Sequence, residues 1–339
     1  MMMLVPALAA ALVGAPAAPS AAPAYGVVDT LKLGGEGGWD YLTFDPTSRR
    51  LFVSRGTHVV VVDADTKATV GDIPDTPGVH GIAIATDLGR GFVSNGRAAT
   101  ATIFDLKTLG KVGEVKTGQN PDAILYDKAS GRVLTFNGRS ADATAFDAAR
   151  GTVVGTVPLG GKPEFAVADG QGRVYVNIED TSEIVALDSR DLQVKARWPL
   201  KPCEEPSGLA FDAEHARLFS VCRNRLMAVV DAGTGRVITT LPIGGGVDGA
   251  AFDPATGLAF SSNGEGTVTV VHEDSPDTFR VVDTVKTQRG ARTVALDPKT
   301  HRLFLSTAEF GPPPPATAEA PRPRPSIVPG TFVVLVLGR

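Results

Sequence analysis

Polar and charged side chains that could take part in chemistry recur at two positions of a repeating pattern. The first set has about one member every 40 residues: Asp40, His80, Asp122, Glu164, Ser207, Asp248 and Arg292. The second set follows 13 to 16 residues later in each copy: Arg55, Asn95, Asn137, Asn177, Arg223, Asn263 and Thr307, with Arg97 and Arg139 beside it. Guanidinium groups bind carboxylates and phosphates, whereas carboxylate and amide oxygens bind hard cations.

The arginines predict a binding site for a small anionic ligand, such as a carboxylate, a phosphate or a carbohydrate acid. The five that belong to the two sets or flank them are Arg55, Arg97, Arg139, Arg223 and Arg292. An alternative is that these polar side chains only line a water-filled channel.

The carboxylates and asparagines leave a second kind of site open, a Ca²⁺ site of the sort that metal-dependent hydrolases of the lactonase type use. No other cofactor is expected. No two of the five histidines have the spacing of zinc ligands, and no Ser/His/Asp arrangement is recognisable, so the sequence favours binding over catalysis.

The elements that must position these residues come from an internal repeat. An apolar, alternating segment that ends in Asp occurs seven times at intervals of 40 to 44 residues, at Asp45, Asp87, Asp127, Asp169, Asp212, Asp253 and Asp297. A turn and further β-rich segments follow each Asp, which gives four short strands in each unit. Such units are the blades of a β-propeller. We therefore predict an all-β, seven-bladed propeller in which both polar sets lie at one mouth of the central channel.

The two ends of the chain predict how the ring closes. The last repeat lacks a fourth strand after residues 331–337, while Val27–Leu33 resembles the fourth strand of the sixth repeat, residues 281–287. The N-terminal segment should therefore complete the last blade, which leaves no open sheet edge there. An open solenoid would instead carry capping ends. A Pro-rich insertion at 311–330 should project from the mouth face, either as a docking strip or lid or as a tolerated loop.

The first 24 residues differ from the rest. Residues 1–14 are apolar or small, and an Ala- and Pro-rich stretch follows, which is typical of a secretory signal peptide although no Lys or Arg precedes it. We expect a mature domain at 25–339 that is periplasmic or secreted. In that oxidising setting Cys203, in the loop that enters the fifth unit, and Cys222, at the end of its second strand, are expected to pair. The alternative is two buried free thiols.

The second strands carry a motif that resembles a known family. Phe92-Val-Ser-Asn95, Tyr175-Val-Asn177 and Phe260-Ser-Ser-Asn263 resemble the signature of the YVTN-repeat (YncE-like) propellers, in register with the Asp turns. The resemblance covers residues 25–339 and implies an exported propeller more firmly than an activity. The Asn is replaced at Arg55, Cys222 and Thr307, so the motif is incomplete in those units.

These observations favour an exported binding or scaffold protein. The ligand is expected to be a small anion or an extracytoplasmic protein at the channel mouth, with metal-dependent hydrolysis as the alternative. Nucleic-acid binding is a weaker alternative, because 37 acidic and 33 basic residues give a formal charge of −4. No segment is long and apolar enough to span a membrane, and we expect a monomer.

Overall fold

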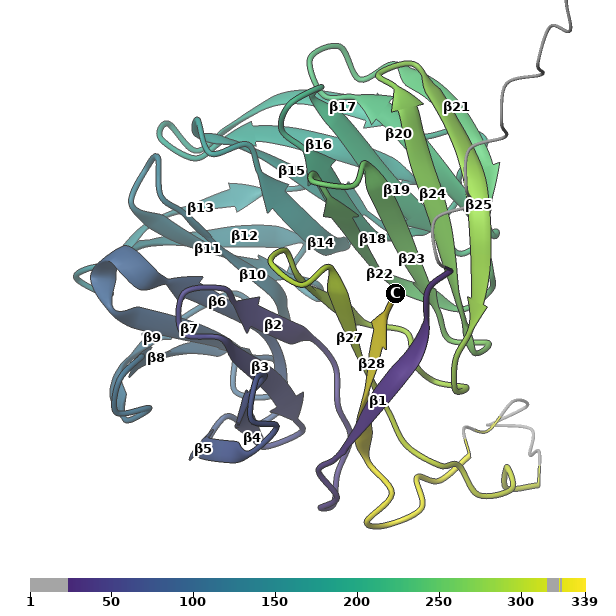
Figure 1. The fold of residues 1–339 in the computed structure, drawn as a ribbon. Coiled ribbons are helices and arrows are strands. Elements are labelled where there is room, and N and C mark those ends of the chain that lie inside the picture. The colour runs from purple at the N-terminus through teal and green to yellow at the C-terminus, as the bar shows by residue number, and fades with distance from the viewer. Residues whose placement is uncertain (1–23, 316–322, 324) are drawn as a thin grey trace, which may run out of the picture.

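Seven four-stranded antiparallel sheets make up almost all of the protein in a computed structural model that describes residues 24–315, 323 and 325–339. The predicted signal peptide lies outside the described residues, apart from its last residue. Each repeat forms one blade, and the blades surround a central channel (Figure 1). The predicted seven-bladed β-propeller is confirmed. No helix in the described part of the chain is long and apolar enough to cross a membrane.

The blades are numbered from the N-terminus. Blade one contains β2 (Leu42–Asp45), β3 (Arg50–Arg55), β4 (His58–Asp63) and β5 (Thr69–Ile73). Blade two contains β6 (Val79–Ala85), the short 3₁₀ helix η1 (Thr86–Leu88), β7 (Arg90–Asn95), β8 (Thr100–Asp105) and β9 (Lys111–Lys116). Blade three contains β10 (Pro121–Asp127), β11 (Arg132–Asn137), β12 (Asp142–Asp147) and β13 (Val153–Pro158). Blade four contains β14 (Pro163–Ala168), β15 (Arg173–Ile178), β16 (Glu183–Asp188) and β17 (Gln193–Pro199).

The remaining blades follow the same order. Blade five contains β18 (Pro206–Asp212), β19 (Arg217–Cys222), β20 (Leu226–Asp231) and β21 (Val237–Pro242). Blade six contains β22 (Val247–Asp253), β23 (Leu258–Asn263) and the longer β24 (Thr267–Ser275) and β25 (Thr278–Lys286). Blade seven contains β26 (Val294–Asp297), β27 (Arg302–Thr307), β28 (Val333–Gly338) and β1 (Gly26–Lys32).

The hydrophobic core consists of seven layers, each between two neighbouring blades. The second and third strands of each blade are almost wholly buried because layers cover both of their faces, as in β3 and β4. The fourth strands are largely exposed. The inner strands approach closely, and a Cβ on Gly208 of β18 would lie 2.7 Å from the Ala250 nitrogen.

The repeated Asp side chains hold the turns that follow the first strands, as expected. In blade one, Asp45 accepts hydrogen bonds from the backbone nitrogens of Thr47 (3.0 Å) and Ser48 (3.3 Å). These turns lie at the far end of the first strand from the residues at the channel mouth, because each first strand runs from the mouth to its Asp. The turns therefore form the opposite rim of the ring.

The ring closes as the sequence predicts. Strand β1 pairs antiparallel with β28 from Gly26 opposite Gly338 to Lys32 opposite Val333, and the sheet order is β1-β28-β27-β26. Figure 1 shows β1 lying along β28. The first and last segments of the described chain thus share one blade.

The Pro-rich insertion leaves from the end of β27, on the mouth face. Its base is tied down by a β-bridge between Phe310 and Ile327 and by a hydrogen bond from the Gly311 nitrogen to the Ser326 carbonyl oxygen (2.9 Å). Residues 316–322 and 324 lie outside the described residues.

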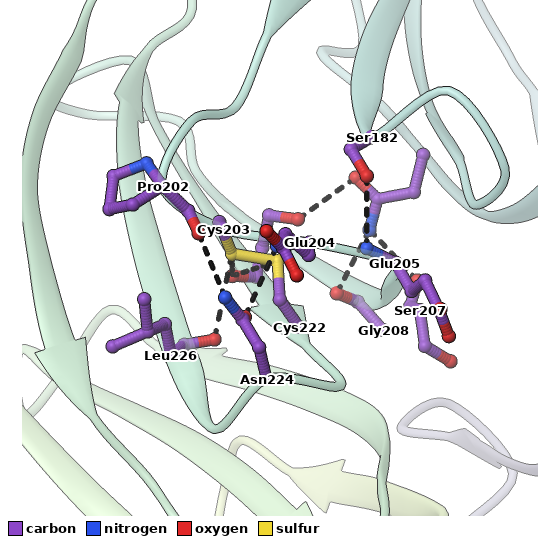
Figure 2. The surroundings of a disulfide bond; sticks show 12 residues. Ser182, Pro202, Cys203, Glu204, Glu205, Ser207, Gly208, Cys222, Asn224 and Leu226 are labelled. Atoms are coloured by element: carbon purple, nitrogen blue, oxygen red, sulfur yellow. Dashed lines mark hydrogen bonds between the residues drawn. A yellow bond between two sulfur atoms is a disulfide. The ribbon is translucent and has the colours of Figure 1, made fainter.

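Cys203 and Cys222 form the expected disulfide (Figure 2). Cys203 lies in the loop before β18 and Cys222 ends β19, and both are buried. The same loop is held by Asn224, whose side chain donates to the Pro202 carbonyl oxygen (2.8 Å) and accepts from the Glu204 nitrogen (3.1 Å). The disulfide therefore fixes the loop that leads to the mouth residue Ser207.

Replacing both cysteines with alanine is expected to lower the free energy of unfolding by about 3 kcal/mol, because the bond closes a short loop in the unfolded chain. Urea denaturation of the oxidised wild type and the double variant measures this difference. Addition of a reductant should bring the wild type to the stability of the variant. Equal midpoints for the two oxidised proteins would contradict the prediction.

Candidate cation site at the channel mouth

A cavity of about 430 Å³ opens at one mouth of the channel. All seven members of the first polar set line it: Asp40, His80, Asp122, Glu164, Ser207, Asp248 and Arg292. Each stands at or just before the start of a first strand, so equivalent repeat positions place them around the axis. A more open hollow of about 740 Å³ lies at the edge between blades one and two, but it does not gather charged groups from around the ring.

Besides Gly246 and Val247, four residues with polar side chains line the cavity that the sequence analysis did not predict as site residues: Tyr41, Lys162, Glu179 and Glu205. Glu179 stands two positions after Asn177, where Arg97 follows Asn95 and Arg139 follows Asn137 in other blades. The repeat register was thus a signal that could have found Glu179. Lys162 lies two residues before Glu164, a member of the first polar set. This position in the repeat could likewise have indicated that Lys162 lies at the mouth.

The centre of the site is a contact between three blades. His80 Nδ1 lies 2.5 Å from Asp40 Oδ2 and 3.8 Å from Asp122 Oδ1. One ligand atom from each of these residues falls within 4.8 Å of the other two. Asp40 is further fixed by its backbone nitrogen, which donates to Ser54 Oγ (2.9 Å). An imidazole nitrogen and two carboxylate oxygens converge here.

Burial and crowding of like charges shape the electrostatics. Burial alone would lower the pKa of His80, but the hydrogen bond to Asp40 and the charge of Asp122 raise it to about 9. Burial, and then the charge of Asp40, raise the pKa of Asp122. Burial also raises the pKa of Glu164 to about 8, with Asp122 adding to the effect. The mouth therefore holds more negative charge than it can solvate easily.

The permanently cationic side chains at the mouth are already paired. Lys162 contacts both Glu164 and Glu179. Arg292 Nε lies 3.1 Å from Asp248 Oδ2, and Arg223 Nη1 lies 2.7 Å from Glu205 Oε2. Together with the protonated His80, these three cations face six carboxyl groups, of which Glu164 largely keeps its proton at neutral pH. The remaining charge of the cavity lining is slightly negative, which favours a cationic ligand.

Arg55 does not reach the cavity, contrary to its predicted place. It is 2% exposed, and its guanidinium carbon lies 3.7 Å from the centre of the Phe332 ring. Its Nη2 donates to the carbonyl oxygens of Gly34 (3.0 Å) and Glu36 (3.1 Å), while burial lowers its pKa to about 10. Arg55 packs the segment after β1 instead.

The four asparagines of the second set are also inside the blades rather than on the cavity wall. All are fully buried: Asn95, Asn137, Asn177 and Asn263. Asn95 Nδ2 donates to Thr100 and Thr102 on the neighbouring strand, and Asn263 Nδ2 donates to Thr267 and Thr269 in the same way. Their side-chain amides hydrogen-bond to neighbouring strands. Contrary to the prediction, these asparagines do not line the cavity where a ligand would bind.

Arg97 and Arg139 are exposed, but neither lines the cavity. Of the five arginines of the predicted anion site, only Arg223 and Arg292 line the mouth, and both face carboxylates there. The structure therefore does not assemble the five arginines into one site.

No protein-family model matches the chain, and no curated protein matches it. Among solved structures, a chain of "Structure of U3-55K" matches with a TM-score of 0.76 at 10% identity, covering 92% of this chain and 99% of that one. A chain of "Crystal Structure of Mitotic Checkpoint Complex" matches at 0.75 and 13% identity, covering 99% of both. A chain of "Kuenenia stuttgartiensis Hydrazine Synthase" matches at 0.70 and 15% identity, covering 79% and 92%.

Identities this low show the fold alone. The protein is therefore a seven-bladed β-propeller.

Proposed function

We propose that the protein is a cation-binding propeller whose channel mouth takes a divalent metal ion on Asp40, His80 and Asp122. The observation that carries this proposal is the convergence of these three ligand atoms within 4.8 Å in an acidic cavity. Burial, and then the charge of Asp40, raise the pKa of Asp122, and a bound cation would offset both effects.

The donor set indicates which ion suits the site. One imidazole nitrogen with two carboxylate oxygens suits zinc or a similar first-row ion, whereas Ca²⁺ prefers six to eight oxygen ligands. The proposal therefore departs from both the anion and the Ca²⁺ expectation. A protein partner that presents a Lys or Arg side chain would use the same negative charge.

A zinc titration of the mature protein, residues 25–339, tests the proposal. The variant carrying His80→Asn and Asp122→Asn is expected to lose one equivalent of tight zinc binding, with an affinity at least about 100-fold weaker, because two of three ligands are gone. His58→Asn, at the edge between blades one and two, is the matched control and should bind as the wild type does. Unchanged zinc binding by the double variant would overturn the proposal.

Glu164 favours metal-dependent hydrolysis as a second candidate. Its raised pKa leaves much of this carboxyl protonated at neutral pH, and the cavity has room for a small ester or lactone beside an ion. Zinc-loaded protein would then hydrolyse lactones, and Glu164→Gln would slow the reaction at unchanged zinc affinity. Absence of turnover across a panel of lactones and esters leaves binding as the function.

We also propose that the protein is an exported member of the YVTN-repeat propellers. The second-strand motif supports the family, and the disulfide supports an oxidising compartment. The ordered packing of Tyr25 against Phe260 is consistent with a mature chain that starts there.

Expression of the full chain in a bacterium is expected to yield a periplasmic or secreted protein that begins at or near Tyr25. The physical reason is that the apolar segment before it has the length and small-residue ending that signal peptidase accepts. Cell fractionation with intact-mass measurement checks the site. A cytoplasmic protein that retains residues 1–24 would contradict export.

A further inference from the structure

The rim opposite the mouth carries a second convergence of ligand atoms, at the junction of blades five and six. Asp212 ends β18, His215 lies in the turn that follows it, and Glu273 lies in β24 of the next blade. His215 Nδ1 lies 2.8 Å from Asp212 Oδ2 and 3.0 Å from Glu273 Oε1. One ligand atom from each lies within 4.8 Å of the others.

Other junctions show what this position normally contains. In four of them the repeated Asp of one blade receives a hydrogen-bond donor from the following blade. These contacts are Arg49 to Asp297 (2.7 Å), the Tyr126 hydroxyl to Asp87 (3.1 Å), Ser189 to Asp127 (2.5 Å), and His301 Nδ1 at 2.8 Å from Asp253 Oδ2. At the junction of blades five and six, the following blade contributes a carboxylate instead. Two acceptors therefore face each other where a donor and an acceptor usually meet.

The imidazole cannot satisfy both carboxylates. His215 Nδ1 carries at most one proton, which the closer Asp212 takes. Among the residues that the structure describes, neither carboxylate oxygen of Glu273 then has a hydrogen-bond donor. The Glu273 side chain is only 3% exposed, so water solvates it poorly. A buried carboxylate without a donor is costly. Burial, together with the charge of Asp212, accordingly raises its pKa.

Arg217, the nearest permanent cation, does not supply the missing donor. Its Nε donates to the Pro276 carbonyl oxygen (2.6 Å), and its Nη1 lies 3.0 Å from Asp231 Oδ2. Its Nη2 lies 3.3 Å from Asp277 Oδ1. Its charge reaches Glu273 only at longer range. None of these Arg217 donors is bonded to Glu273, so a cation from solution could complete this cluster.

We propose that a zinc ion binds Asp212, His215 and Glu273 and joins blades five and six. Ligand atoms of tetrahedral zinc at about 2.1 Å from the ion lie about 3.4 Å apart, so the cluster needs to open by only a few tenths of an ångström. The partly exposed edge of His215 leaves a path for the ion and room for a water in the fourth position. This site is structural and separate from the one at the mouth.

Zinc titration of residues 25–339 in the His80→Asn, Asp122→Asn background isolates the second site. That background is expected to retain one equivalent of zinc, and adding Glu273→Gln should weaken the remaining affinity by about 100-fold, since even residues that only support metal ligands contribute about 10- to 100-fold. Zinc should also raise the melting temperature of the background variant but not that of the Glu273→Gln variant.

Two controls separate a metal ligand from a packing residue. His301→Asn removes an imidazole with the same 2.8 Å contact to a repeated Asp but without a third carboxylate among its described contacts, and it should leave zinc binding intact. Glu273→Gln should keep or raise the melting temperature of the zinc-free protein, because it removes an unpaired buried charge. Unchanged zinc affinity in the Glu273→Gln variant would overturn the proposal. A background variant that binds no zinc would also overturn it. Neither result would affect the assignment of the mouth site.

Discussion

Raising the pH from 5 to 9 is expected to lower the thermal stability of the metal-free protein. The mouth is responsible, because His80 and Glu164 both have higher pKa values in the folded chain than in the unfolded one. The pKa of His80 rises from 6.5 to about 9, and that of Glu164 rises from 4.5 to about 8. Between each pair of values the folded state holds a proton that the unfolded state has released.

The sign follows directly from this proton difference. Stability falls with rising pH wherever the folded state binds more protons than the unfolded state. His80 contributes stability that is fully present below pH 6.5 and is lost as the pH rises through about 9. One pKa unit corresponds to about 1.4 kcal/mol, which limits the contribution of His80 to about 3 kcal/mol. Glu164 contributes stability of the same kind, which is lost as the pH rises from 4.5 through about 8.

Melting temperatures of apo protein between pH 5 and 9 measure the effect, and the combined variant His80→Asn, Glu164→Gln should flatten the profile. Carboxylates with lowered pKa values, such as Asp63 and Asp105, do not interfere because they titrate below this window. A divalent ion should restore stability most at high pH, where it has no proton to displace. A wild-type profile that is flat or rises with pH would contradict the prediction.

The fold could be predicted from the sequence because the ring is a sum of similar units. Seven Asp turns in register specify seven blades, and each blade buries its apolar strands only against neighbours. The match between residues 27–33 and 281–287 then specified where the chain closes. Such local patterns, repeated at a fixed interval, need no knowledge of long-range side-chain contacts.

The site could be predicted only in part, and the errors have a physical cause. The sequence placed the first polar set at the mouth, since register alone decides that position. It could not show whether a second-set side chain turns into the blade, as Asn137 does toward Asp142 and Thr144. Nor could the sequence show that Arg223 forms an ion pair with Glu205, so that its guanidinium group is no longer free to bind an anionic ligand.

The histidine clusters are a second feature that the sequence could not predict. His80 and His215 have no sequence neighbours with zinc-ligand spacing, so the sequence argued against a site of this kind. Their carboxylate partners in the structure include groups from other blades, about 40 to 60 residues away, as Asp40 and Glu273 show. In a propeller the ligands of one ion come from equivalent positions of different units, and linear spacing does not reveal them.

Removing β1 is expected to have the largest effect on folding. A chain that starts at residue 34 lacks the partner of β28. The unpaired edge of β28 would then expose the otherwise buried Val334 and Val336 to other chains. Loss of the buried Leu31 alone should cost about 2–5 kcal/mol. We expect this truncated protein to aggregate, as measured by size-exclusion chromatography, while residues 25–339 elute as a monomer.

A circular permutant separates the role of the strand from the role of the chain end. Joining Arg339 to Tyr25 through a short Gly/Ser linker and opening the chain between Gly37 and Gly38 keeps β1 beside β28 and keeps the Arg55 contacts to Gly34 and Glu36. Because Gly26 already faces Gly338 across the sheet, the linker adds a hairpin without strain. The permutant should melt within a few degrees of the wild type and bind zinc at the mouth. A soluble, monomeric truncation with an unchanged melting temperature would show that the ring does not depend on this pairing.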